Sequence, residues 1–408
     1  MAYFNQTQAN FNQSNMSAFG TLETAELTPV IQGDFVYGLN SQLWNTGVVS
    51  GTGATVDTNV NRLRIQSGTV STNYAYITSR RIIRYRAGQG TLIRFTPLFT
   101  TGVANNDQFW GVGTVASNAI FDGYFFGYHG TSFGIGYYNS GAAINFTAQA
   151  SWNVDPMNGT GPSGLTLDPT KGSPVMIKYP YLGYGSIFFF VETPSGIWAL
   201  VHTIQYPNTS TATQLSNPSM QFIGFTANSG NTTNVTMYCA SVGAFVCGER
   251  NFIGNPKWAI DNNKAGISTT ETCILNLQNC TTYNTKVNRG LVRLQSLSLA
   301  TPTNNTLITL RLRIGATIGG SPSYTAISGT GGGATITSSN SIVSFDTAGT
   351  TATAGTYIFA MQSGAQGSPV LDLATFNIII APGEILTMSA MASASSTVGI
   401  SVTWTEDI

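Results

Sequence analysis

The stretch GYFFGYHGTSFGIGYY, residues 123–138, indicates what kind of fold this chain adopts. Aromatic residues dominate two short runs, 123–130 and 132–138, and such residues favour extended strands. The turn-forming sequence Tyr-His-Gly-Thr at 128–131 separates the runs, which indicates a hairpin. The stretch therefore predicts antiparallel β-structure.

Similar runs recur on both sides of this hairpin. They are rich in Val, Ile, Tyr, Phe and Thr, and Gly, Asn or Pro residues bound them, so each run predicts a strand. The clearest are 74–87, 91–102, 108–115, 174–183, 185–193, 197–204 and 235–248. No window of about a dozen residues keeps the helical period of about 3.6 residues, so we expect little helix. The pattern is typical of a β-sandwich.

The C-terminal part of the chain predicts a second all-β domain. Its strand-like runs are 271–278, 290–300, 307–318, 356–363, 374–383, 384–394 and 398–406. In 307–314, polar residues that include Arg311 and Arg313 alternate with apolar ones, which predicts one wet face and one buried face. The Gly/Ser/Thr-rich stretch 319–341 predicts an exposed loop region.

Composition changes along the 408 residues divide the chain into four parts. Residues 1–30 are rich in Asn, Gln, Ser and Thr and predict an extended polar N-terminal arm. Residues 31–250 predict the first β-sandwich domain. A cluster of charges with Gly and Pro marks 251–265 as a linker, and 266–408 form the second domain. We therefore expect an all-β protein with two antiparallel β-sandwich or jelly-roll-like domains.

Charge is scarce and balanced in this sequence. Charged residues make up 8% of the chain, with 17 basic and 17 acidic side chains, where about 25% is usual. A neutral surface has little self-repulsion, which favours association with further copies of the chain. Without a basic excess we expect no nucleic-acid partner. The apolar runs are far shorter than the roughly 20 residues that insert into a membrane, and residues 1–19 lack the pattern of a secretory signal.

Side chains that perform chemistry are few. The only histidines are His129 and His202, and no nucleophile motif accompanies them, so we expect no catalytic triad. A calcium site on Asp155 or Asp168 lacks EF-hand spacing. Glycoside hydrolysis stays open as an alternative through four scattered carboxylates: Asp122, Asp155, Asp168 and Glu192. The leading prediction is a protein that is not an enzyme, with no catalytic residue, metal or cofactor.

The four cysteines follow no common zinc or redox signature. They are Cys239, Cys247, Cys273 and Cys280. We expect plain thiols, with a disulfide as the alternative in an oxidising compartment.

Two groups of residues are candidates for a binding surface. On a strand over 74–87, the side chains of Arg80, Arg84 and Arg86 would share one face and form a stripe for a phosphate or a sulfated glycan. The interpretation that we favour is that they pair with acids or carbonyls of a neighbouring subunit, where arginine is enriched. Aromatic side chains stack on sugars but also fill cores. The aromatic candidates are Tyr124, Tyr128 and Trp152.

Four blocks in the middle of the chain occur in a recognisable order. They begin SRRIIRYRAGQG at residue 79, GYFFGYHG at 123, WNVDPMNGTG at 152 and KYPYLGYGS at 178. Over roughly Thr72 to Gln214 this series resembles a β-sandwich module of virion proteins of large double-stranded DNA viruses and tailed phages. The resemblance implies a particle component of the minor capsid, penton, spike or fibre type, and it brings no catalytic residues.

We therefore expect a structural protein of a virion, which assembles as a homo-oligomer with copies of itself and with other capsid proteins. A receptor- or glycan-binding attachment module is the alternative, with a host surface glycan or receptor as its partner. A glycoside hydrolase is the second alternative. No membrane insertion is expected.

Overall fold

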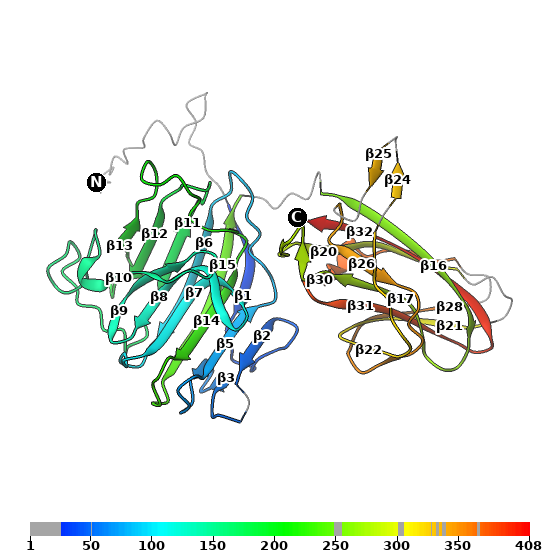
Figure 1. The fold of residues 1–408 in the computed structure, drawn as a ribbon, viewed down its shortest axis with the longest axis horizontal. Coiled ribbons are helices and arrows are strands. Elements are labelled where there is room, and N and C mark those ends of the chain that lie inside the picture. The colour runs from blue at the N-terminus through cyan, green and yellow to red at the C-terminus, as the bar shows by residue number, and fades with distance from the viewer. Residues whose placement is uncertain are drawn as a thin grey trace, which may run out of the picture. The chain divides into compact units, whose positions relative to one another are not determined.

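The computed structural model describes residues 26–49, 51–248, 255–300, 306–327, 329–331, 334–336, 340–364 and 368–408. The chain divides into two compact units made of antiparallel sheets (Figure 1). The first comprises Met1–Ser79 and Tyr85–Arg250, and the second Arg80–Arg84 and Asn251–Ile408. The predicted all-β fold class is confirmed. Within the described ranges, no helix has the length and apolar character needed to cross a membrane.

The first unit contains an eight-stranded and a seven-stranded antiparallel sheet. In spatial order the eight-stranded sheet consists of β13 (Trp198–Ile204), β12 (Ile187–Glu192), β11 (Val175–Tyr179), β6 (Thr91–Leu98), β15 (Thr236–Cys247), β4 (Arg62–Gln66) and β3 (Thr55–Asn59), with β1 (Leu27–Gly33) also paired to β15. The seven-stranded sheet consists of β10 (Asn145–Ala148), β9 (Ser132–Tyr138), β8 (Ala119–His129), β7 (Asn106–Ala116), β14 (Gln221–Asn228), β5 (Tyr74–Ser79) and β2 (Trp44–Val48).

Aromatic side chains from both sheets fill the core of the first unit. The ring centroid of Phe95 on β6 lies 6.0 Å from that of Phe222 on β14, and that of Phe189 on β12 lies 5.3 Å from that of Phe126 on β8. Trp110 of β7 stacks on Phe222. All five side chains are buried. Because burying one such side chain contributes about 1.5–3 kcal/mol, this layer is a major source of stability.

The second unit also contains two larger antiparallel sheets. One consists of β16 (Lys257–Ile267), β32 (Ser396–Asp407), β20 (Leu291–Ala300) and β29 (Val370–Asp372), with β30 (Ile379–Ile380) also paired to β20. The other consists of β23 (Thr325–Ala326), β26 (Val343–Asp346), β17 (Thr272–Asn279), β31 (Ile385–Ala392), β21 (Ile308–Ile314) and β28 (Thr356–Ser363). A mainly aliphatic core, with Leu294, Leu297, Leu310, Leu312 and Trp404 among its buried residues, joins them.

Short elements complete the described structure. The two-stranded ribbons are β18 (Thr282–Tyr283) with β19 (Lys286–Val287), β22 (Thr317–Ile318) with β27 (Ala352–Thr353), and β24 (Gly329–Gly331) with β25 (Ala334–Ile336). The helical elements among the described residues are the 3-10 turns η2 (Gln149–Ser151) and η3 (Ala374–Phe376).

Several predicted boundaries were wrong. The strand expected over 74–87 ends at Ser79, because the following arginines leave the sheet to meet acidic partners. The predicted linker 251–265 contains most of β16, whose half-buried residues alternate with exposed ones despite the nearby charges. Residues 1–25 of the predicted arm lie outside the described residues, and the end of that arm belongs to β1. The stretch 374–383 holds η3 and the short β30 instead of one strand.

Gly127 on β8 provides a test of the packing in the seven-stranded sheet. A methyl group on Gly127 would overlap the carbonyl oxygen of Gln108 and lie 2.8 Å from Cδ1 of Phe109. We expect Gly127→Ala to lower the free energy of unfolding by at least about 2 kcal/mol, because this backbone contact cannot relax. Urea denaturation monitored by tryptophan fluorescence measures this loss.

Gly172 is the matched control, because a methyl group there would meet no atom within 4 Å. Gly172→Ala should change the free energy of unfolding by less than about 0.5 kcal/mol. Equal stability of the two variants would contradict the packing described for β8.

Candidate functional site

The outer face of the seven-stranded sheet presents a row of aromatic side chains. The pairing register places Tyr76 of β5 opposite Phe225 of β14, and Phe225 opposite Phe109 of β7. Opposite residues of paired strands point to the same side of a sheet. These rings therefore lie on the side away from Trp110 and Phe222, which face the eight-stranded sheet.

A second row of rings lies beside the first. Phe125 of β8 and Phe146 of β10 both stand opposite Gly136 of β9, on the same side of the sheet. Tyr138 of β9 packs edge-on against the first rings, with ring centroids 6.3 Å from Phe109 and 6.1 Å from Phe125. We call these six residues the aromatic face: Tyr76, Phe109, Phe125, Tyr138, Phe146 and Phe225.

Glycine residues allow these rings to lie close to the backbone. A methyl group on Gly134 would lie 2.7 Å from Cζ of Phe146, and one on Gly127 would meet the ring of Phe109. The rings of Phe146 and Phe109 thus occupy the space that a side chain at Gly134 or Gly127 would fill. The aromatic face is consequently built from rings packed against the backbone of the sheet.

The aromatic face has a buried layer and an outer layer. Phe109 and Phe125 are fully buried, whereas Tyr76, Tyr138 and Phe146 are only partly buried and pack over that layer. Burial raises the pKa of Tyr76 and Tyr138 above its ordinary value, so both hydroxyl groups stay neutral. The outer layer therefore offers aromatic surface together with neutral hydroxyl groups.

A carboxylate and an imidazole lie at the rim of the aromatic face. Asp107 of β7 stands opposite His129 of β8, and 2.7 Å separates Oδ1 of Asp107 from Nδ1 of His129. The ring centroid of His129 lies 5.6 Å from that of Phe146, and half of the His129 side chain is exposed. Burial raises the pKa of Asp107, and the hydrogen bond to His129 opposes that rise. This pair offers a half-exposed imidazole and a mostly buried carboxylate beside the rings.

The predicted arginine stripe does not form. Arg80, Arg84 and Arg86 lie outside any strand, so alternation does not align their side chains. In the second unit Arg80 pairs with Glu384, and Nε of Arg84 lies 3.7 Å from Oδ1 of Asp407. Arg86 lies in the loop before β6, where its carbonyl accepts a hydrogen bond from the Gln89 amide. The acidic partners of Arg80 and Arg84 come from this same chain.

The three aromatic residues predicted for binding are buried in the core of the first unit. Tyr124 and Tyr128 alternate with Phe125 on β8 and so point to the inner side. The hydroxyl of Tyr124 donates a hydrogen bond to Oε1 of Gln214. Trp152 is 4% exposed and packs against Phe126. None of the three lies on an exposed surface, because Tyr124 and Tyr128 stand on the inner side of β8 and Trp152 packs against that side.

Three of the four carboxylates considered for glycoside hydrolysis hold local structure together. Asp122 is fully buried and accepts hydrogen bonds from the hydroxyl of Ser216 and the amide of Ser140. Asp155 accepts hydrogen bonds from two loop amides; burial would raise its pKa, but these bonds lower it. Asp168 closes a turn with the Thr170 amide. Glu192 ends β12.

The second histidine and the cysteines are structural as well. His202 is 6% exposed, accepts a hydrogen bond from the Asn153 amide, and has its pKa lowered by burial. All four cysteines are free, and burial raises the pKa of Cys239 to about 12 and that of Cys273 to about 11. In the part of the chain that the structure describes, no group of three or more His, Cys, Asp or Glu side chains could hold a metal.

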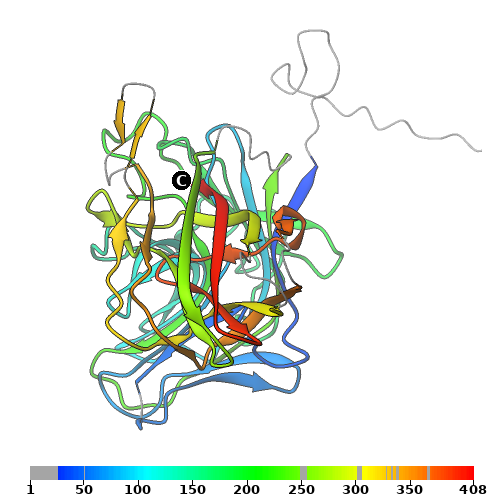
Figure 2. The same cartoon turned by 90° about the vertical axis from the view of Figure 1, so that its right-hand side faces the viewer.

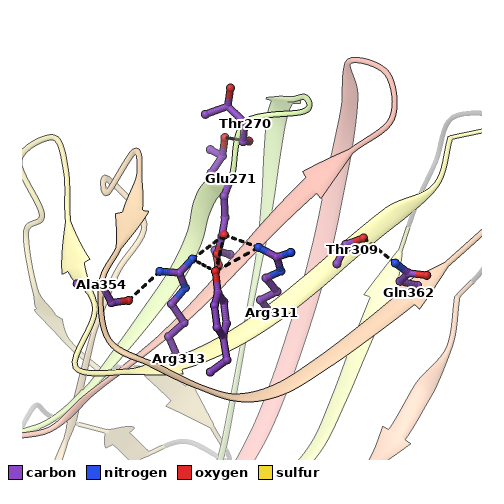
Figure 3. Close-up of polar contacts among 10 residues, drawn as sticks. Thr270, Glu271, Thr309, Arg311, Arg313, Ala354 and Gln362 are labelled. Atoms are coloured by element: carbon purple, nitrogen blue, oxygen red, sulfur yellow. Dashed lines mark hydrogen bonds and ion pairs between the residues drawn. The ribbon is translucent and has the colours of Figure 1, made fainter.

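A charged cluster on the second unit was not predicted from the sequence. Glu271 lies between Arg311 and Arg313 of β21 (Figure 3), and its Oε2 accepts hydrogen bonds of 2.8 and 2.6 Å from them. The Ser389 hydroxyl donates to Oε1 of Glu271, and the Tyr357 hydroxyl donates to Oε2. The Arg313 side chain is only 7% exposed, so the predicted wet face of β21 was wrong at this residue. The Glu271 carboxylate compensates the charge of the Arg313 guanidinium, and this allows the guanidinium to be buried.

Hydrogen bonds determine the charge state of this cluster. Burial would raise the pKa of Glu271, but bonds from Ser389, Arg311, Arg313 and Tyr357 outweigh it and lower the pKa below its ordinary value. Both guanidinium groups also lie over the ring of Tyr357, at 5.1 Å for Arg311 and 4.0 Å for Arg313. The cluster holds three charges, and one carboxylate serves two cations.

Comparison with known proteins gives no family for this chain. No protein-family model matches the sequence, and no curated protein matches it significantly. Among solved structures, a Bacillus licheniformis beta-glucanase is 14% identical with a TM-score of 0.35, and covers 54% of this chain and 98% of its own. The Emp47p carbohydrate recognition domain is 10% identical with a TM-score of 0.34, and covers 55% and 98%. A Bauhinia forficata lectin is 11% identical with a TM-score of 0.31, and covers 52% and 99%. These scores are too low to transfer an activity or a ligand.

The Glu271 cluster predicts a large loss of stability when its carboxylate is removed. Glu271→Gln leaves Arg311 and Arg313 without their shared anion, and removing one partner of a buried ion pair costs about 3–5 kcal/mol. Because Arg311 is partly exposed, we expect the lower end, about 3 kcal/mol, in urea denaturation at pH 7. Glu192→Gln is the control, because no hydrogen bond or ion pair of the Glu192 side chain exists among the described residues.

The difference in free energy of unfolding between wild type and Glu271→Gln should depend on pH. A lowered pKa in the folded state means that Glu271 stabilises the protein above its unfolded-state pKa of about 4.3, and that this contribution disappears as the pH falls through the folded-state value. The stability difference between wild type and Glu271→Gln should therefore shrink below about pH 4. A difference that stays constant down to pH 3 would contradict the role of this carboxylate.

Proposed function

We propose that this protein binds carbohydrate through the aromatic face and its rim. The observation behind this proposal is the position of the Asp107–His129 pair beside partly exposed aromatic rings. A sugar ring has an apolar face of C–H groups and an edge of hydroxyl groups. Its apolar face fits against Tyr138 and Phe146, and its hydroxyl groups reach the carboxylate and the imidazole.

Binding is favoured over catalysis at this face. Glycoside hydrolysis commonly uses two carboxyl groups that flank the scissile bond. Here the titratable pair is one carboxylate and one imidazole, joined directly to each other. The raised pKa of Asp107 comes from burial, and its hydrogen bond to His129 fixes its orientation. We therefore infer a glycan-binding module and not a glycosidase.

The proposal predicts which substitutions abolish binding. Tyr138→Ala or Phe146→Ala should weaken binding of a glycan about two- to tenfold, because one aromatic contact contributes about 0.5–1.5 kcal/mol beyond its area and about 1.4 kcal/mol is a factor of ten. Asp107→Asn should weaken it further, because the charged hydrogen-bond acceptor is lost. A glycan array identifies the ligand, and isothermal titration of the best glycan then measures each variant.

Tyr37→Ala is the matched control, since Tyr37 is 97% exposed and lies in a loop between β1 and β2. It should bind as wild type does. Thermal unfolding of every variant separates lost binding from lost folding. An array without hits for the wild-type protein, or a folded Asp107→Asn variant with wild-type affinity, would refute the proposal.

A structural role in a virus particle is the second candidate. The balanced charge of 17 basic and 17 acidic residues and the virion-like sequence blocks favour it. We expect the protein to form oligomers in solution and to occur in purified particles. Light scattering and mass spectrometry of particles measure these two properties. A dilute monomer that is absent from particles would contradict this role, and glycan binding would be unaffected by that result.

A further inference from the structure

Strand β16 has an unpaired edge in the second unit. It extends over eleven residues, Lys257–Ile267, and pairs on one side with β32 (Figure 2, where β16 is yellow-green and β32 red). It ends its sheet, so no strand among the described residues pairs with its other side. No bulge interrupts its pairing between Lys257 and Lys264. Long regular edges of this kind accept a further strand.

The hydrogen-bond pattern identifies the backbone groups on this edge. The amide of Glu406 on β32 donates a 3.0 Å hydrogen bond to the carbonyl of Pro256, so Pro256 faces β32. In an antiparallel pair, residues that bond to the neighbouring strand alternate with residues that point the other way. The amide and carbonyl groups directed to the open edge are therefore those of Lys257, Ala259, Asp261 and Asn263.

The first three of these residues present complementary side chains. Lys257, Ala259 and Asp261 are exposed, whereas Trp258 and Ile260 between them are half-buried against the core. Neither Lys257 nor Asp261 has a hydrogen bond or ion pair through its side chain in the described structure. Four residues along a strand separate their backbones by about 13 Å, so these charges do not pair within one chain.

We propose that β16 pairs in antiparallel fashion with β16 of a second copy of this chain, with Ala259 on the two-fold axis. Lys257 of each copy then stands opposite Asp261 of the other, and the amides of Lys257, Ala259 and Asp261 on each strand find a carbonyl partner. Trp258 stands opposite Ile260 on the other side of the new sheet. Pro256, which lacks an amide proton, falls where the new ladder requires none.

Other symmetric registers are less favourable. An axis at Asp261 places two carboxylates opposite each other and leaves Lys257 opposite Ala265, so the charges repel. An axis at Asn263 places Asp261 opposite Ala265 and gives no ion pair. The Ala259 axis is the register that pairs each exposed charge with its opposite, and the small alanine side chain permits close approach there.

Charge reversal and charge exchange test this pairing. In sedimentation velocity of the full chain over a concentration series, Asp261→Lys should raise the dissociation constant of the self-association step at least about tenfold, because two lysines then face each other. The double variant Lys257→Asp with Asp261→Lys should restore association, because it re-creates both ion pairs. Lys286→Glu is the control for altered net charge, since Lys286 lies on the β18–β19 ribbon.

A disulfide provides a second measurement. Ala259→Cys should form a disulfide-linked dimer under mild oxidation, because paired Cα atoms about 5.5 Å apart suit a disulfide. Ala265→Cys, exposed on the same strand, should not form one. A wild-type protein that remains monomeric at all concentrations would overturn the proposal. So would folded Asp261→Lys that associates as wild type does, or a double variant that does not recover.

Discussion

The close approach of aromatic rings to glycine backbone is the constraint on which the seven-stranded sheet depends. On the inner side, a methyl group on Gly224 would overlap the ring of Trp110, and on the outer side one on Gly127 would meet Phe109. Both faces of one sheet are therefore lined with rings. Because neighbouring positions hold glycine, a one-residue slip would place ring against ring and leave gaps elsewhere, so this packing also fixes the register.

The second unit meets a different constraint, since one face of its six-stranded sheet is polar and largely buried. Asn276 and Thr387 are fully buried on adjacent strands, and Arg313 stands opposite Thr387. Buried polar groups cost free energy unless they are hydrogen-bonded. Asp346 meets this requirement by accepting bonds from the Asn276 side chain and from backbone amides of the following loop, as Glu271 does for the arginines. Asn276 and the two arginines thus have acidic partners, whereas Oγ1 of Thr387 has no hydrogen-bond partner among the described residues.

Local pattern predicted strands well but predicted contacts between strands poorly. The hairpin at 123–138 and the alternation in 307–314 follow from residue type within a few positions, and all three strands formed. Asp107 and His129 are 22 residues apart and meet only through the β7–β8 register. Asp107 directly precedes the predicted strand 108–115, and His129 lies near the end of the predicted strand 123–130. Antiparallel pairing of these two strands would therefore have predicted their contact. Tyr124 was misassigned because an aromatic-rich strand gives no indication of which side faces the core.

A single aromatic site of this kind binds a sugar weakly, because little surface is buried and the hydroxyl groups must exchange water for protein partners. Two linked sites bind a surface that displays many glycans far more tightly, since the second contact becomes intramolecular. Self-association through the edge of β16 would supply such a pair without any change at the aromatic face. The proposed assembly and the proposed glycan binding are therefore compatible in one chain, because separate β-sheets would perform them. The scarcity of charge helps both, as it limits repulsion between copies and leaves aromatic and amide groups to make the contacts.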